Sequence, residues 1–136
     1  MMASVTFRHL ESKKDRELIA HDGTSPLEMW YKAVRDKPID EFTYNDLCKA
    51  CRQQVFPEAV VPIAIERLRK EPLAGEMYDG ELIAAMTYVD RKYWSAHPSQ
   101  ALDVTTMAKS LIQQVDDDLR SELAGLLALA PPSQRP

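Results

Sequence analysis

The sequence predicts an all-α fold, a single-domain helical bundle of about five to seven helices. Apolar residues recur every three or four positions along most of the chain after Ser25, which is the spacing of one helix face. Several of these stretches open with a residue that caps helices well, and none alternates polar and apolar residues before a hairpin turn. The 136 residues contain no internal repeat, so we expect one domain with its own hydrophobic core.

The N-terminal 24 residues differ from the rest of the chain. They are polar and mixed in charge, so we expect residues 1–24 to form a mobile or loosely docked arm, with a short helix near Asp15 to Ala20. The helical domain is expected to follow directly. Its first helix begins after the N-cap Ser25 and has Pro26 at its first position.

Two further helices are predicted between residues 43 and 72. Thr43 is expected to cap the first of them, which carries both cysteines on its apolar face. The second is expected to begin near Val60, because Pro62 is tolerated in a helix only within the first turn, and Pro72 ends it.

Residues 71–83, EPLAGEMYDGELI, are expected to connect this helix to the next one. In this interpretation Gly75 supplies a positive φ in the turn and Asp79 caps the following helix, while Tyr78 packs its ring on the core and keeps its hydroxyl in water. The stretch is not a phosphate-binding loop, because it lacks the Gly-Lys-Ser/Thr end and its charge is negative.

The remainder of the chain is predicted to be helical as well, so the domain spans residues 25–130. A stripe from Leu82 to Val89 forms one helix, and a short helix ends at Pro98. The last helical stretch is either one long helix or two that break near Asp116 to Asp118, and residues 131–136 are expected to be a disordered tail. The apolar faces predict a core that includes Trp30, Leu47, Ile65, Leu68, Leu82, Met86 and Leu111.

Composition excludes several classes of function. The net charge of −4 and the pI of about 5.4 argue against direct binding of nucleic acid, which requires clustered Lys and Arg. No segment has the pattern of a signal peptide or a transmembrane helix, and two cysteines cannot form the disulfide framework of a small secreted domain. We therefore expect a cytoplasmic protein that does not contact a membrane.

The residue types that usually carry chemistry form no recognisable site. Cys48 and Cys51 match C-x-x-C, but the pair lies inside a predicted amphipathic helix, and a zinc site would need two further ligands. We expect them to be buried core thiols. His9, His21 and His97 are scattered singly, and no nucleophile elbow or metal-binding helix is present. The sequence thus predicts no enzyme, no catalytic residue, no cofactor and no metal site.

The order of segments across residues 33–98 resembles the helical immunity proteins of bacterial contact-dependent growth inhibition (CDI) systems. The resembling stretches are AVRDKPIDEFTYNDLCKACRQQ, VVPIAIERLRKEPLAGEMYDGELIAAM and YWSAHP. Their most distinctive pieces are PIAIERL, EPL and YDGEL. The resemblance implies a cytoplasmic antidote that binds the toxic C-terminal domain of its cognate delivery protein, commonly a nuclease, and blocks it.

Acidic stretches are the candidate binding residues under this hypothesis. A nuclease active site is basic, so carboxylates that mimic its substrate would favour binding, although a single acidic run is also typical of a solvated helix face. From charge and resemblance together, we expect the toxin to contact Glu76, Tyr78, Asp79, Glu81, Asp116, Asp117 and Asp118. The alternative function is a helical adaptor or regulator that binds another protein with no toxin involved.

Overall fold

The computed structural model describes residues 5–11 and 25–128 and confirms the all-α class. These residues form eight α-helices and two 3₁₀ turns, without a strand. In chain order they are α1 (Phe7–Leu10), α3 (Pro26–Val34), η1 (Ile39–Glu41), α4 (Tyr44–Arg52), α5 (Pro57–Lys70), α6 (Glu81–Ala85), η2 (Met86–Tyr88), α7 (Arg91–Ala96), α8 (Pro98–Leu111) and α9 (Asp117–Leu127). Within this part of the chain, no helix combines the length and the apolar character needed to span a bilayer.

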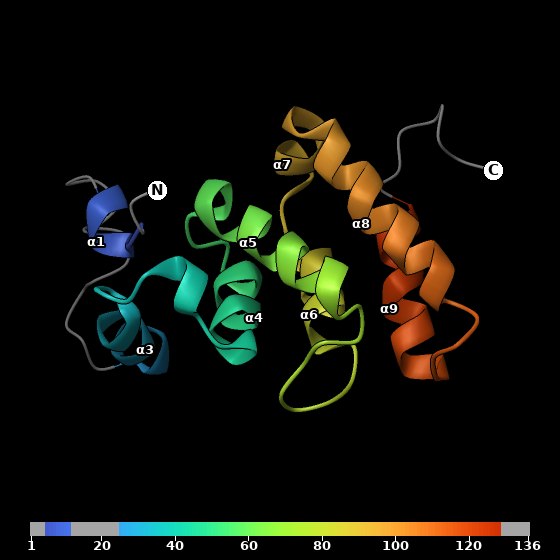
Figure 1. The fold of residues 1–136 in the computed structure, drawn as a ribbon, viewed down its shortest axis with the longest axis horizontal. Helices are drawn as coiled ribbons and strands as arrows, with labels where there is room; N and C mark the ends of the chain where they lie inside the picture. The colour runs from blue at the N-terminus through green and yellow to red at the C-terminus, as the bar shows by residue number, and fades with distance from the viewer. Residues whose placement is uncertain (1–4, 12–24, 129–136) are drawn as a thin grey trace.

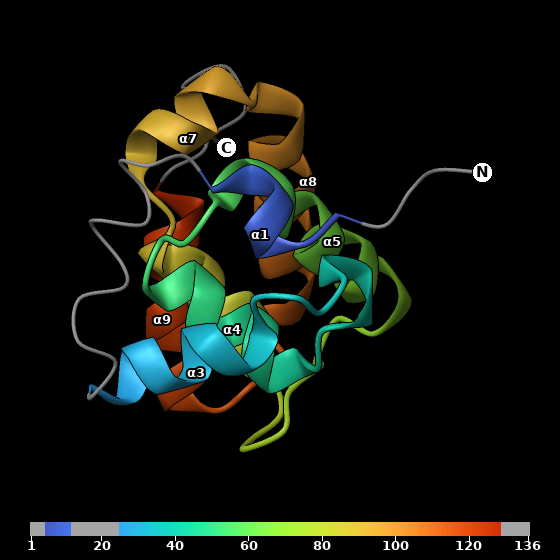
Figure 2. The same ribbon diagram turned by 90° about the vertical axis from the view of Figure 1, so that its left-hand side faces the viewer.

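The helices are arranged in three neighbouring groups along the long axis of the molecule (Figure 1). The first group is α1 and α3 at one end, the second is α4, α5 and α6 in the middle, and the third is α7, α8 and α9 at the other end. Figure 2 shows the molecule from the α1 and α3 end. Direct packing joins α4 to α5 and α6, and it joins α8 to both α5 and α9, so the three groups share one core.

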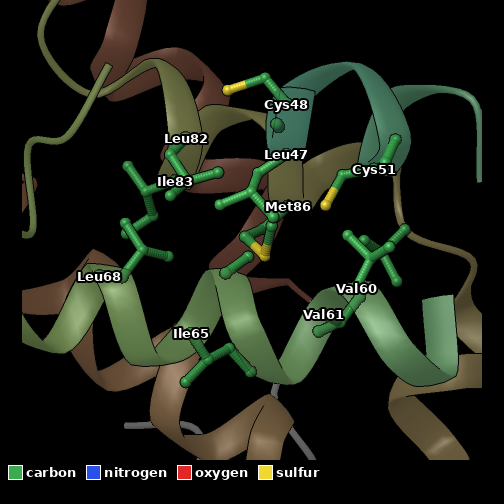
Figure 3. Close-up of a cluster of buried hydrophobic side chains, with 14 of the residues drawn as sticks. Leu47, Cys48, Cys51, Val60, Val61, Ile65, Leu68, Leu82, Ile83 and Met86 are labelled. Carbon is green, nitrogen blue, oxygen red and sulfur yellow. The ribbon is translucent and has the colours of Figure 1, made fainter. Parts of the chain in front are cut away.

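The centre of the core lies between α4, α5 and α6 (Figure 3). Six residues that were predicted to be buried are buried: Leu47, Ile65, Leu68, Leu82, Met86 and Leu111. The seventh prediction, Trp30, is wrong, because this side chain is only half-buried. Its indole Nε1 donates a hydrogen bond to Asp46 Oδ1 at 3.0 Å, and a Trp with a polar partner at the surface keeps that edge of the ring near water.

The helix α5 begins three residues earlier than predicted. Its first residue is Pro57, and the preceding Phe56 adopts a left-handed conformation with φ 44°. Pro62 therefore lies inside the helix rather than in its first turn. The missing N–H of Pro62 would have bonded to the carbonyl of Glu58, and both residues are exposed, so water can satisfy that carbonyl.

The second half of the chain follows the predicted pattern. The side chains of Leu82, Ile83, Met86 and Val89 are buried as one stripe. The C-terminal helical stretch is broken in two, because α8 ends at Leu111 and Asp116 caps α9 by accepting a hydrogen bond from the Leu119 N–H at 2.9 Å. α9 then packs against α6, η2 and α8.

Residues 5–11 are tightly docked, which corrects the prediction of a loosely held arm for this segment. The Phe7 side chain is 0% exposed and lies at the centre of an aromatic cluster. The rings around it, with centroid distances of 5.3–6.1 Å, belong to Trp30, Tyr31, Phe42 and Phe56. A single aromatic residue in a polar segment has thus been enough to anchor it, since one buried ring removes a large apolar surface from water.

Backbone and charge contacts reinforce this docking. The Arg8 N–H donates to the Arg35 carbonyl at 3.1 Å, and the Val5 carbonyl accepts from the Ile39 N–H at 2.8 Å. Arg35 also forms a two-point ion pair with the carboxylate of Glu11. The predicted helix near residues 15–20 and the predicted tail at residues 131–136 lie outside the described residues.

Cys48 and Cys51 are free thiols inside the core, as predicted, and lie beside Leu47 on α4 (Figure 3). Burial raises the pKa of Cys48 to about 12 and also raises the pKa of Cys51. A thiol that stays protonated is a weak nucleophile and a weak metal ligand, so both residues act as small apolar side chains. Among the residues that the structure describes, no three His, Cys, Asp or Glu side chains are placed to hold a metal ion.

Replacing Phe7 with alanine tests the anchor of the N-terminal segment. We expect Phe7→Ala to lower the free energy of unfolding by about 3–5 kcal/mol, the usual cost of emptying a buried aromatic position. Val5→Ala is the matched control, because Val5 is on the same segment but exposed; its effect should stay within about 0.5 kcal/mol. Urea unfolding of both variants measures this, and equal small effects would contradict the docking of residues 5–11.

The buried thiols predict a component of stability that depends on pH. In the unfolded chain a thiol ionises near pH ~8.5, whereas the folded protein keeps Cys48 protonated up to a pKa of about 12. Alkaline pH therefore favours the unfolded state, so this contribution to stability is complete below pH ~8.5 and is lost as the pH rises. A Cys48→Ala/Cys51→Ala variant should be less stable than wild type at pH 7.5, and the difference should shrink by pH 10 under reducing conditions. Urea unfolding at the two pH values measures this difference in the free energy of unfolding. A difference that stayed constant would contradict the burial of the thiols.

Candidate functional site

An open hollow of about 580 Å³ lies where the loop between α5 and α6 meets the first turns of α9. We call it the acidic hollow. Four of its lining residues carry carboxylates, and the described residues that line it are Tyr78, Asp79, Asp116, Asp118, Leu119 and Glu122. Two acidic stretches that lie almost 40 positions apart in the sequence therefore form a single surface.

Gly80 explains why the two stretches can meet. Its φ of 87° is left-handed, and a Cβ at this position would lie 2.3 Å from Cδ2 of the buried Leu119. Only glycine permits both this conformation and this close approach of the loop to α9. Gly80 is also the N-cap of α6, which corrects the prediction that Asp79 caps this helix. Asp79 is exposed instead, at the wall of the hollow.

The loop that leads to Gly80 is held by a buried carboxylate. Glu81 is 2% exposed, and its Oε1 accepts hydrogen bonds from the backbone N–H groups of Glu76 at 3.1 Å and Met77 at 3.2 Å. Its Oε2 lies 3.5 Å from Nη2 of Arg52, at the end of α4. Glu81 was predicted to contact the toxin, but its carboxylate is buried and its partners lie inside the protein. We therefore do not count it among the exposed candidate contact residues.

Gly75 has a steric role in this loop rather than the positive φ that was predicted for it. Among the described glycines only Gly80 has a positive φ. A Cβ on Gly75 would lie 2.2 Å from the carbonyl oxygen of Tyr78 and 2.7 Å from Cβ of Glu81. The absence of a side chain thus lets the two sides of the loop approach each other.

Two large side chains of the loop, those of Met77 and Tyr78, face water. Tyr78 is 45% exposed, which corrects the prediction that its ring packs on the core, and Met77 is 77% exposed. Partial burial raises the pKa of Tyr78, and the negative charge of Glu122 adds to the shift. The Tyr78 ring therefore forms part of the hollow together with a carboxylate of α9.

The aspartates at the start of α9 have different roles. Asp116 caps the helix, and Asp117 lies outside the hollow with its side chain 97% exposed, 3.4 Å from Arg120. Asp118 lines the hollow, and Glu122, four residues later on the same helix face, lines it too. Glu122 was not predicted as a site residue, although its spacing from Asp118 is a signal that could have identified it.

Three carboxylates of the hollow have no ion-pair partner among the described residues. Asp79, Asp118 and Glu122 form no ion pair with any described residue. Arg52 is held beside the loop by its ion pair with Glu81, so its positive charge is already paired. Unpaired carboxylates around one opening produce a concentrated negative potential, which attracts a cationic partner.

The two described histidines do not line the hollow. His97 Nε2 is 2.9 Å from an oxygen of Glu58, and its ring stacks on Tyr93 at the junction of α7 and α8. His9 accepts a hydrogen bond from the Thr6 N–H at the start of α1. His21 lies outside the described residues. The acidic hollow therefore contains carboxylates, a phenol and a leucine, which suit binding of a basic surface.

A comparison with known protein families identifies the chain. The family model of CDI immunity proteins matches residues 12–104, which is 93 of the 136 residues. The match includes the loop wall of the acidic hollow, with Tyr78 and Asp79, and ends before the α9 wall. No curated protein matches the chain. Because the family model covers more than half of the sequence, the chain belongs to the family of CDI immunity proteins.

Proposed function

We propose that the protein binds the C-terminal domain of its cognate CDI toxin through the acidic hollow, that this domain is a nuclease, and that binding blocks its active site. Membership of the immunity family implies a cognate toxin as the partner. A nuclease holds its phosphate substrate with Lys and Arg, so its active face is positively charged. The observation that carries the proposal is the set of four carboxylates around one opening, with no counter-charge on three of them among the described residues.

The proposed contact residues are those that the hollow presents to solvent. Asp79 on the loop and Asp118 and Glu122 on α9 supply negative charge from two sides. Tyr78 lines the same hollow and supplies a partly exposed ring, which is the kind of side chain that anchors the centre of an interface. Glu76 and Met77 extend this surface at the exposed rim of the loop.

The lining also favours inhibition by binding over catalysis. Among the described residues that line it, there is no cysteine, histidine, serine or threonine that could act as a nucleophile or a base beside the carboxylates. In this proposal the protein acts in the cytoplasm as a stoichiometric inhibitor, by covering the toxin's substrate-binding face.

Neutralising the hollow tests the role of its charge. In an Asp79→Asn/Asp118→Asn/Glu122→Gln variant we expect association with the cognate toxin domain to slow by about tenfold or more at low salt, because electrostatic steering is lost. The dependence of the association rate on salt should flatten as well. Stopped-flow or surface-based kinetics at several salt concentrations measure both effects.

The control for this variant carries the same change in net charge elsewhere. Asp40→Asn/Glu41→Gln/Glu66→Gln removes three exposed carboxylates on η1 and α5, outside the hollow. It should keep the association rate within about twofold of wild type if steering is local to the hollow. Equal effects of the two variants would contradict the acidic hollow as the docking surface, and a toxin domain that cleaves no nucleic acid would contradict the nuclease assignment.

Truncating Tyr78 tests the proposed aromatic anchor. We expect Tyr78→Ala to raise the dissociation rate by about 30-fold or more, the effect of losing a hot-spot residue that contributes about 2 kcal/mol. Tyr88→Ala is the matched control, because Tyr88 is 53% exposed but does not line the hollow. Its dissociation rate should stay within about twofold of wild type, as expected outside an interface. The anchor is refuted if the two tyrosine variants dissociate equally fast.

A further inference from the structure

We propose that Glu81 and Arg52 are positioning residues of the interface: they hold the loop of residues 74–80 in its binding shape before the toxin arrives. Neither residue needs to touch the toxin for this role. The inference deepens the proposed function and rests on it, because it concerns the same surface.

Glu81 connects two parts of the chain through its two oxygens. One oxygen accepts the N–H groups of Glu76 and Met77 from the loop, and the other faces the guanidinium of Arg52 on α4. The Glu81 side chain is 3% exposed, so water cannot replace these partners without opening the loop. The carboxylate thereby joins the middle of the loop to a helix of the core.

Further backbone contacts close the two ends of the loop. The Gly80 N–H donates to the Leu73 carbonyl at 2.8 Å, and the Leu82 N–H donates to the Ala74 carbonyl at 3.0 Å. With both ends joined and its middle held by Glu81, the loop projects Met77 and Tyr78 into water although both are apolar or aromatic. A loop that is ordered in advance avoids the entropy cost of ordering on binding.

Arg52 links this arrangement to the proposed aromatic anchor. Partial burial raises the pKa of Tyr78, and the positive charge of Arg52 opposes that shift. Arg52 is itself half-buried at the end of α4, and its guanidinium lies 3.5 Å from the buried carboxylate of Glu81. Loss of the pair should therefore change the position of the loop and of the ring together.

Two double variants separate the positioning role from charge. Arg52→Met/Glu81→Leu and Arg52→Met/Glu81→Gln both leave the net charge of the protein unchanged, and they differ only in the side chain at position 81. Gln keeps an oxygen that can accept the two loop N–H groups, whereas Leu offers none. Replacing a buried ion pair by apolar residues often has little effect on stability, so the Leu variant can fold.

We expect the Leu variant to bind the cognate toxin domain about tenfold or more weakly, because only a fraction of the molecules present the competent loop. The Gln variant should bind at least several-fold more tightly than the Leu variant. The salt dependence of association should remain that of wild type in both variants, since every carboxylate of the hollow is still present. Asp46→Asn is the control for loss of a buried carboxylate elsewhere, because Asp46 is buried at the start of α4 and outside the hollow; it should leave binding unchanged below its unfolding temperature.

A measurement on the unmodified protein keeps the inference testable if the Leu variant does not fold. The amide hydrogens of Glu76 and Met77 should exchange with solvent about 100-fold or more slowly than in an unstructured peptide, because Glu81 accepts both of them. Exchange at the unstructured rate would overturn the inference, as would equal binding by the Leu and Gln variants. The Asp79→Asn/Asp118→Asn/Glu122→Gln variant tests the proposed function separately. If that variant binds like wild type, the proposed function fails, independently of the result for the loop.

Discussion

A carboxylate that folding removes from water must regain partners inside the protein, and this constraint shapes the candidate binding surface. Glu81 meets it by accepting two backbone N–H groups from one loop and by pairing with Arg52 on α4. In this conformation of the loop, Gly75 lies against the Tyr78 carbonyl and Cβ of Glu81, where a side chain would not fit. This conformation directs Tyr78 and Asp79 outward. The buried carboxylate of Glu81 thus helps to set which side chains of the loop are exposed in the hollow.

The second requirement is the contact between Gly80 and Leu119. A left-handed glycine allows the loop to lie directly on the first turns of α9, so the carboxylates of two distant segments surround one opening. The family match covers the loop side of that opening and ends before the α9 side. The surface thus combines a segment that the family model matches with one that lies outside the match.

Many local features of the structure could be predicted from the sequence, although the start of α5 and the N-cap of α6 were predicted wrongly. Several features that depend on tertiary contacts could not be predicted. The caps at Ser25 and Thr43 and the apolar stripes of the helices are local, because each depends on residues within one or two turns. The burial of Glu81 could not be read from the sequence, since an acidic residue in an acidic stretch is expected at the surface. The anchoring role of Phe7 also depended on partners in three other segments. The meeting of the loop with α9 required the fold itself.

A structure of the complex with the cognate toxin domain would test the central claim most directly. The account predicts that Lys or Arg side chains from the toxin's active face lie within ion-pair distance, about 4 Å, of Asp79, Asp118 or Glu122. It also predicts that Tyr78 is buried in the contact and that the loop keeps the shape it has in the free protein. A complex in which the acidic hollow remains open to solvent, with the toxin bound to another face, would contradict it.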